Sequence, residues 1–142
     1  MNSHECDGVV RLRVRYAETD QMGVVYHANY LVWCEIGRTE LMRQYGFPYA
    51  GIESTGIRLA VAEASLRYSR AARYDDPIRV ITRIGAVQSR TISFAYEVYR
   101  DDDASELLAT ASTRLVAIDE RGVSRRLPPD LIERFRASTL AD

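Results

Sequence analysis

The chain has 142 residues, of which 46% are apolar and 27% charged, a composition ordinary for one soluble globular domain. Its net charge of −1 at pH 7 argues against a protein whose main task is to grip nucleic acid. All 19 basic residues are arginine, which excludes chemistry through a lysine nucleophile or a lysine Schiff base.

Residues 1–8 are expected to form a loose tail, and residues 9–142 a single domain. The start of the chain is short and polar, unlike a secretion signal, and no apolar run is close to membrane length. The two cysteines, Cys6 and Cys34, do not make a disulfide framework and suit a reducing compartment. We therefore expect a cytoplasmic protein without a membrane span.

An alternating pattern begins the predicted domain. Apolar residues alternate with arginines at Val10, Leu12, Val14 and Tyr16. This period of two predicts a half-buried strand over residues 9–16. A polar loop follows with the acid pair Glu18 and Asp20, and Gly23 allows the chain to bend.

The pattern then changes to the period of a helix, with apolar residues at gaps of three and four. They are Tyr30, Trp33, Cys34, Gly37, Leu41 and Tyr45. Their spacing and length predict a helix of about five turns, with Gly46 as its C-terminal cap. Glu35 and Arg38 are read as a structural pair on this helix. Asp20 is thus a carboxylate just before a helix N-terminus, whose unpaired N–H groups can hold an oxyanion.

The second half of the chain reads as consecutive strands. Residues 47–56 are read as a connection, and the strands are predicted at residues 57–70, 78–87, 90–100 and 107–118. Asp101 to Asp103 should form a hairpin tip, and residues 130–137 a short C-terminal helix. One long helix followed by several strands predicts an α+β fold with a mostly antiparallel sheet.

Two blocks of the sequence together resemble a known family. The first is Tyr16-x-Glu-Thr-Asp20-x-x-Gly23-Val-Val-Tyr-His-Ala-Asn-Tyr30, followed by Glu35-x-x-Arg38. The second, less specific block is Val61-Ala-Glu-Ala-Ser-Leu-Arg-Tyr68 and then Ala71-Ala-Arg-Tyr-Asp-Asp76. Both resemble the 4-hydroxybenzoyl-CoA thioesterase family, above all its YbgC-like acyl-CoA thioesterases. That family usually has Asp-Thr-Asp where this chain has Glu18-Thr19-Asp20.

The resemblance implies a hotdog fold, in which a curved sheet wraps round one central helix. It implies an acyl-CoA thioesterase that hydrolyses the thioester to free acid and CoA. Asp20 would attack the thioester carbonyl or activate water, and a backbone amide at His27, within one residue, would hold the oxyanion. It also implies a homodimer or homotetramer with active sites at the subunit interface.

Residue type alone leaves the candidate site residues with alternatives. Asp20 could simply cap its own loop or the coming helix. The His27 side chain could orient substrate or water, or be a polar residue at a helix start. Asn29 could hydrogen-bond near the thioester, but helix capping is the favoured interpretation. Tyr26 and Glu63 are secondary candidates without an assigned role.

Several basic residues are candidates for binding CoA phosphates. Arg90 and Thr91 open a strand at a position where the family contacts those phosphates, and a second cluster contains Arg67, Arg70 and Arg73. For any one of them, a solvated strand end is an equally good interpretation. The histidines and cysteines have no metal-binding spacing, so we expect no metal and no cofactor besides the CoA of the substrate.

Other functions remain open at this point. The substrate could be an acyl-carrier-protein thioester, or the chain could be a non-catalytic acyl-CoA or acyl-carrier-protein binding module on the same fold. Asp20 favours an enzyme, because a binding module needs no carboxylate beside an acyl carbonyl. A dehydratase of this fold would pair a histidine with an acid in a different motif, which this sequence lacks.

Overall fold

The computed structural model describes residues 8–140, so Cys6 and all but the last residue of the expected tail lie outside the described residues. Nine elements follow one another along the chain. They are β1 (Gly8–Arg13), the 3-10 turn η2 (Tyr16–Glu18), α1 (Asn29–Gln44), α2 (Tyr49–Glu53), β2 (Arg58–Tyr68), β3 (Pro77–Val87), β4 (Thr91–Arg100), β5 (Leu107–Ile118) and α3 (Pro129–Leu140).

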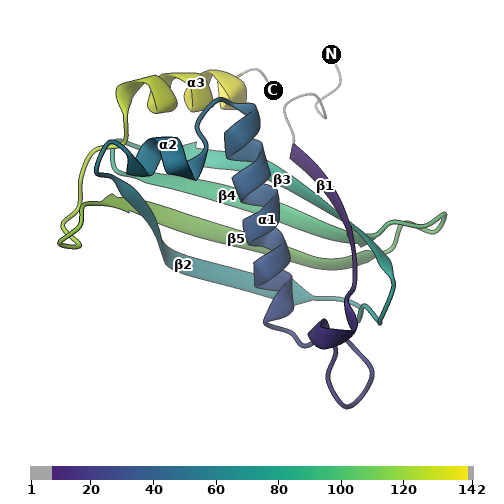
Figure 1. Ribbon diagram of the computed structural model, residues 1–142. Helices are drawn as coiled ribbons and strands as arrows, with labels where there is room; N and C mark the ends of the chain where they lie inside the picture. Colours follow the sequence, from purple (N-terminus) through teal and green to yellow (C-terminus); the bar gives the residue numbers. More distant parts are fainter. Residues whose placement is uncertain (1–7, 141–142) are drawn as a thin grey trace.

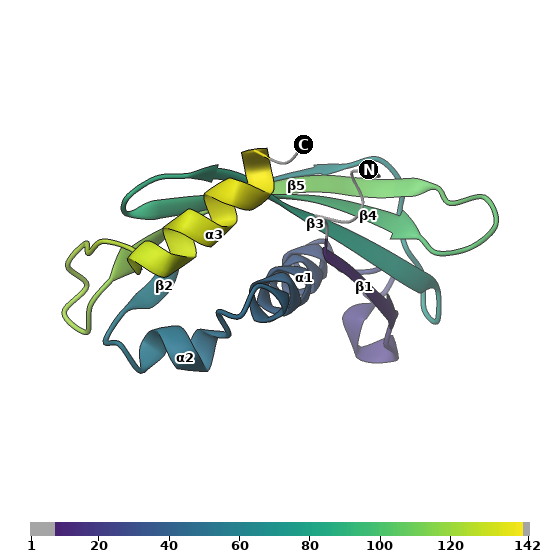
Figure 2. The same ribbon diagram turned by 90° about the horizontal axis from the view of Figure 1, so that it is seen from above.

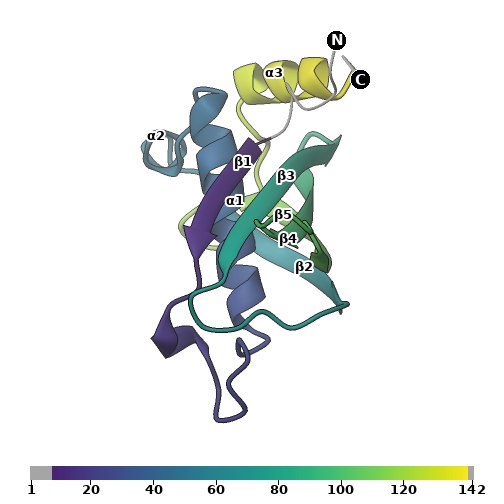
Figure 3. The same cartoon turned by 90° about the vertical axis from the view of Figure 1, so that its right-hand side faces the viewer.

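The strands form one five-stranded sheet in the order β1-β3-β4-β5-β2. Every pair of neighbouring strands is antiparallel. The sheet curves round α1, which lies against one of its faces (Figures 1 and 3). The predicted α+β class and hotdog arrangement are therefore confirmed.

Helix α1 buries the predicted apolar stripe against the sheet, mainly over β1 and β3. The approach is close at Gly37, because a Cβ added there would lie 2.5 Å from the Thr82 hydroxyl. After α1 the chain turns at Gly46, whose φ of +86° is one that glycine adopts without strain. The predicted C-terminal cap of α1 is thus confirmed.

Three sequence predictions about local structure are wrong. Tyr16 is exposed in the turn η2 instead of ending the first strand, because β1 already ends at Arg13. The connection over residues 47–56 contains the short helix α2. Arg38 is buried, and it bonds two tyrosine hydroxyls in place of Glu35.

The two ends of α1 have different surroundings. Beyond its C-terminal end, α3 crosses over the strands near α2, whereas the loop that contains Asp20 lies beyond its N-terminal end (Figures 1 and 2). The edge strand β2 is exposed along most of its length. No helix within residues 8–140 is long and apolar enough to cross a membrane.

Candidate active site

Asp20 begins a tight five-residue turn. Its N–H donates to the Val24 carbonyl at 2.8 Å, and its carbonyl accepts from the Gly23 N–H at 3.1 Å. Its side-chain Oδ1 accepts from the N–H groups of Met22 at 2.8 Å and Val24 at 3.3 Å. Gly23 has a φ of +82°, which agrees with the bend predicted at this residue. Asp20 therefore does cap its own loop, but with only one carboxylate oxygen.

A second turn in the chain has the same hydrogen bonds. Asp119 Oδ1 accepts from the N–H groups of Arg121 at 2.8 Å and Val123 at 3.0 Å. The fourth residue of that turn, Gly122, also has a positive φ, of +80°. Asp119 Oδ2, however, accepts from Arg125 Nε at 2.9 Å. The hydrogen bonds from Val123 and Arg121 and the Arg125 charge lower the pKa of Asp119.

The other oxygen of Asp20 is used differently. Within residues 8–140, Asp20 Oδ2 has no hydrogen-bond or ion-pair partner. Asp20 lines a hollow of about 720 Å³, together with Tyr26 and Asn29. The turn thus fixes the carboxylate through Oδ1 and leaves Oδ2 available to a bound molecule.

Glu18 fastens the base of this loop to α1. Its side chain is buried, and its Oε2 accepts from Trp33 Nε1 at 2.9 Å. Its backbone carbonyl accepts from the Tyr26 N–H at 2.8 Å and from Asn29 Nδ2 at 2.9 Å. Sequence reasoning missed this role, although the indole N–H of a buried Trp33 requires an acceptor and could have indicated it.

The start of α1 leaves backbone N–H groups available. The N-cap residue is Ala28, without a side-chain cap, so the capping prediction for Asn29 is wrong. The Asn29 side chain bonds the Glu18 carbonyl instead. Within the described part of the chain, the N–H groups of His27 and Ala28 donate to no acceptor. These are the amides that an oxyanion at this helix end would meet.

The His27 side chain is exposed and lies between aromatic rings. Its ring centroid is 4.4 Å from that of Tyr26 and 6.4 Å from that of Tyr68. The Tyr68 hydroxyl donates to the His27 carbonyl at 2.9 Å. His27 lines a separate hollow of about 320 Å³ with Tyr68 and Arg70. Tyr68 therefore fixes the helix start, a contact that the sequence did not reveal.

The other candidate residues are distributed over the sheet. Glu63 is exposed and accepts from Arg114 at 2.9 Å, and the hydrogen bond and charge of Arg114 lower the pKa of Glu63. Arg70 pairs with Glu106 at 3.0 Å. Arg67, on β2, is exposed. The structure does not bring Glu63 into the hollow at Asp20.

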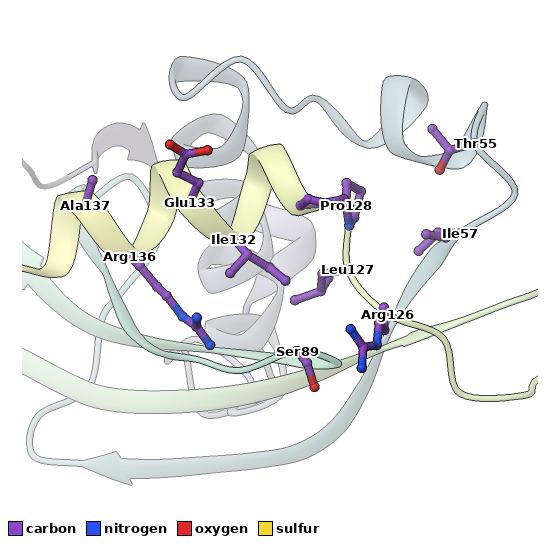
Figure 4. Close-up of a pocket in the computed structure, with 11 residues that line it drawn as sticks. Thr55, Ile57, Ser89, Arg126, Leu127, Pro128, Ile132, Glu133, Arg136 and Ala137 are labelled. Atoms are coloured by element: carbon purple, nitrogen blue, oxygen red, sulfur yellow. The ribbon is translucent and has the colours of Figure 1, made fainter.

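Arg90 and Thr91 lie at the turn between β3 and β4. Arg90 Nη1 donates to the Ser124 carbonyl at 2.9 Å, and the Thr91 hydroxyl donates to the Gln88 side chain at 3.0 Å. The adjacent Ser89 lines a cavity of about 850 Å³ under α3. Arg126 and Arg136 line the same cavity, and both side chains point toward Ser89 (Figure 4).

Comparison with known proteins assigns the family. Residues 14–135 match the sequence pattern of the Thioesterase-like superfamily. The chain belongs to this superfamily. The predicted family resemblance and the predicted class of thioester hydrolase are confirmed at this level.

Individual members of the superfamily are similar over most of their length. A putative acyl-CoA thioesterase, YneP of Bacillus subtilis, is 38% identical over 109 residues, covering 77% of this chain and 78% of YneP. The acyl-CoA thioester hydrolase YbgC of Escherichia coli is 29% identical, covering 88% and 92%. A crystal structure of a DHNA-CoA thioesterase from Staphylococcus aureus superposes with a TM-score of 0.89 at 30% identity, covering 94% and 91%.

Proposed function

We propose that this thioesterase-superfamily protein hydrolyses acyl-CoA to free acid and CoA, with Asp20 as the nucleophile or general base. The observation that carries the proposal is that Asp20 Oδ2 has no partner within residues 8–140. In the equivalent turn at Asp119, the second carboxylate oxygen accepts from Arg125, as expected of a purely structural aspartate. Asp20 lines a hollow with Tyr26 and Asn29. The N–H groups of His27 and Ala28, which lie between these two residues in the chain, donate to no acceptor among the described residues.

The chemistry needs few other groups. As a base, the Asp20 carboxylate removes a proton from water while the water oxygen attacks the thioester carbonyl. As a nucleophile, Asp20 attacks the carbonyl itself, and water then hydrolyses the resulting anhydride. In both routes the N–H of His27 or Ala28 holds the oxyanion, and the C–S bond breaks to release the CoA thiolate. Because a thiolate leaves readily, no strong general acid is required.

Replacing Asp20 by asparagine tests the assignment. The Asn side-chain oxygen keeps the two hydrogen bonds of the turn, but the side chain loses its charge. Asp20→Asn should therefore lower kcat by roughly 10²-fold or more, the scale expected for a lost base, while substrate binding survives. A panel of acyl-CoAs with a thiol reagent measures the released CoA, and calorimetry measures binding.

Asp119→Asn is the matched control, because it makes the same chemical change in a second turn with the same hydrogen bonds. It should leave kcat unchanged even if stability falls. If Asp20→Asn keeps more than about a third of wild-type kcat, the loss is too small for a missing base and the assignment is wrong.

The panel also separates the alternatives. A non-catalytic module would bind acyl-CoA without releasing thiol. An acyl-carrier-protein thioesterase would hydrolyse acyl groups on that protein better than the same groups on CoA. A relative from Arabidopsis thaliana, described as an acyl-acyl carrier protein thioesterase, is 28% identical to this chain. This similarity supports a test of acyl-carrier-protein thioesters beside acyl-CoAs.

The positions of Asp20 and Arg90 favour a site shared between subunits. Helix α1 has 16 residues and so spans about 24 Å. The Asp20 loop lies beyond the N-terminal end of α1 (Figure 1). Arg90 lies toward the other end, because the carbonyl of its neighbour Ser89 accepts from the Leu127 N–H just before α3 (Figure 1). We infer that Arg90 contacts the CoA phosphates of a substrate whose thioester lies at Asp20 of a second subunit.

A further inference from the structure

Arg38 is a buried cation without a counter-charge. Its side chain is almost completely buried on α1, where Nε donates to the Tyr49 hydroxyl at 2.6 Å and Nη1 to the Tyr96 hydroxyl at 3.2 Å. No carboxylate of the described residues forms an ion pair with it, and its Nη2 has no hydrogen-bond partner among them. A buried guanidinium in this state favours an anionic oxygen as its partner.

Arg38 lines a groove. The groove has a volume of about 330 Å³ and lies between α1 and the strands β2 and β5. It is lined by Leu31, Val32, Glu35, Arg38, Val61, Ala64 and Thr113. Its walls are mostly apolar, and its polar lining residues are Glu35, Arg38 and Thr113.

The groove runs along the N-terminal half of α1. Leu31 belongs to the first turn of α1, next to the free amides of His27 and Ala28. Arg38 lies nine residues beyond Asn29, the first residue of α1, which is about 13.5 Å along the helix axis. A long-chain acyl group whose thioester carbonyl lies at the helix start therefore reaches Arg38 with its far end.

We propose that this groove holds the acyl group and that Arg38 recognises a carboxylate at its far end, so that the preferred substrates are CoA thioesters of dicarboxylic acids. The inference rests on the proposed thioesterase function. Glu35 also lines the groove but is exposed, so solvent screens its charge more than that of the buried Arg38. The field at the inner end of the groove is therefore positive.

The test compares three long-chain acyl-CoAs of equal chain length: dodecanoyl-, 12-hydroxydodecanoyl- and dodecanedioyl-CoA. The wild-type kcat/KM should be at least tenfold higher for dodecanedioyl-CoA than for dodecanoyl-CoA. Arg38→Met should lower the ratio of these two kcat/KM values by roughly 10- to 100-fold, the scale of a hydrogen-bonded charge. Equal losses on both substrates, or a preference for dodecanoyl- or 12-hydroxydodecanoyl-CoA in the wild type, would overturn the proposal.

A second variant keeps the proposal testable if Arg38→Met fails to fold. Glu35→Gln removes the exposed negative charge at the groove. It should raise the ratio of kcat/KM for dodecanedioyl-CoA to that for dodecanoyl-CoA by about two- to fivefold, as expected for a partly screened charge. An unchanged or lower ratio between the two substrates would contradict a carboxylate in the groove.

Binding measurements distinguish this inference from the proposed activity. In Asp20→Asn, calorimetry should show tighter binding of dodecanedioyl-CoA than of dodecanoyl-CoA, and the difference should vanish when Arg38→Met is added. If no thioester is hydrolysed by the wild type but this difference is present, the activity is wrong and the groove assignment stands. If hydrolysis occurs without the difference, the groove assignment is wrong.

Discussion

Two aspartates in this chain begin the same kind of turn, and their second oxygens distinguish them. Both sequences read Asp-x-x-Gly-Val, at residues 20–24 and 119–123. Sequence reasoning identified Asp20 through its family resemblance and correctly kept loop capping as an alternative. Asp20 does cap its own loop through Oδ1. The pairing of Asp119 with Arg125 could not be predicted, because it depends on how the chain folds back after Gly122.

Burial of charged side chains was the least predictable feature at this scale. Arg38 was expected to pair with Glu35, yet it is buried and bonds Tyr49 from α2 and Tyr96 from β4. These two partners lie 11 and 58 residues away in the chain, and α2 itself was not predicted. Helical periodicity gives the side of a helix on which a residue lies, but it does not reveal which neighbours cover that side.

The thiol of Cys34 should be inert in the folded protein. Burial raises its pKa from 9.0 to about 12. Because the folded pKa is the higher one, the stability gained from the neutral thiol is complete below pH 9.0 and is lost as the pH rises toward 12. In a Cys6→Ser variant, a thiol reagent at pH 8 should find almost no reactive cysteine until denaturant is added. Rapid labelling of the native variant would show that Cys34 is accessible.

Among the elements, the strands were the best predicted. The predicted strand at residues 107–118 coincides with β5, and β3 and β4 differ from their predictions by one residue at one end. Alternation succeeds there because one face of each strand contributes to the hydrophobic core while the other is less buried. In β2 the register with β5 shifts between Val61 and Glu63, and the strand is exposed along most of its length, so its alternation carried less information.

The contact of α1 with the sheet should depend on Gly37. An alanine Cβ there would lie 2.5 Å from Thr82 Oγ1 and 3.2 Å from Val80 Cγ1, so Gly37→Ala should destabilise the protein by about 1–3 kcal/mol through overpacking. Gly51→Ala in α2 is the control, since its Cβ would meet only Pro48 at 3.7 Å. Denaturant unfolding measures both.

A double-mutant cycle shows whether this contact is the cause. Thr82→Ala removes the hydroxyl, which is buried without a hydrogen-bond partner among the described residues. The Gly37→Ala penalty should shrink markedly in that background. An undiminished penalty would place the strain elsewhere, at Val80 or in the helix itself.

For the whole molecule, the open edge of the sheet predicts assembly. Strand β2 has a neighbour on one side only and is exposed along most of its length, and Val32, Ile36 and Val61 are exposed apolar residues. Such an edge is normally covered. Light scattering at micromolar concentration should therefore give a mass at least twice the 16.1 kDa of one chain. A mass near that of one chain with full activity would contradict assembly.

The nucleotide end of the substrate can be tested separately. Arg90→Ala should raise KM for CoA thioesters more than it lowers kcat, since the phosphates are remote from the reacting carbonyl. The effect should shrink with a pantetheine thioester, which lacks the nucleotide. Arg121→Ala, an exposed arginine in the neighbouring turn, serves as the control. Equal losses on both substrates would remove Arg90 from the CoA site.

The separation of Asp20 and Arg90 along α1 has a genetic consequence. If each active site takes Asp20 from one subunit and Arg90 from the other, a heterodimer of the two single variants contains one site with both defects and one site with neither. Two alleles that are each defective alone would then restore activity when expressed together. Within a single-subunit site, by contrast, every site of such a mixture would carry one of the two defects.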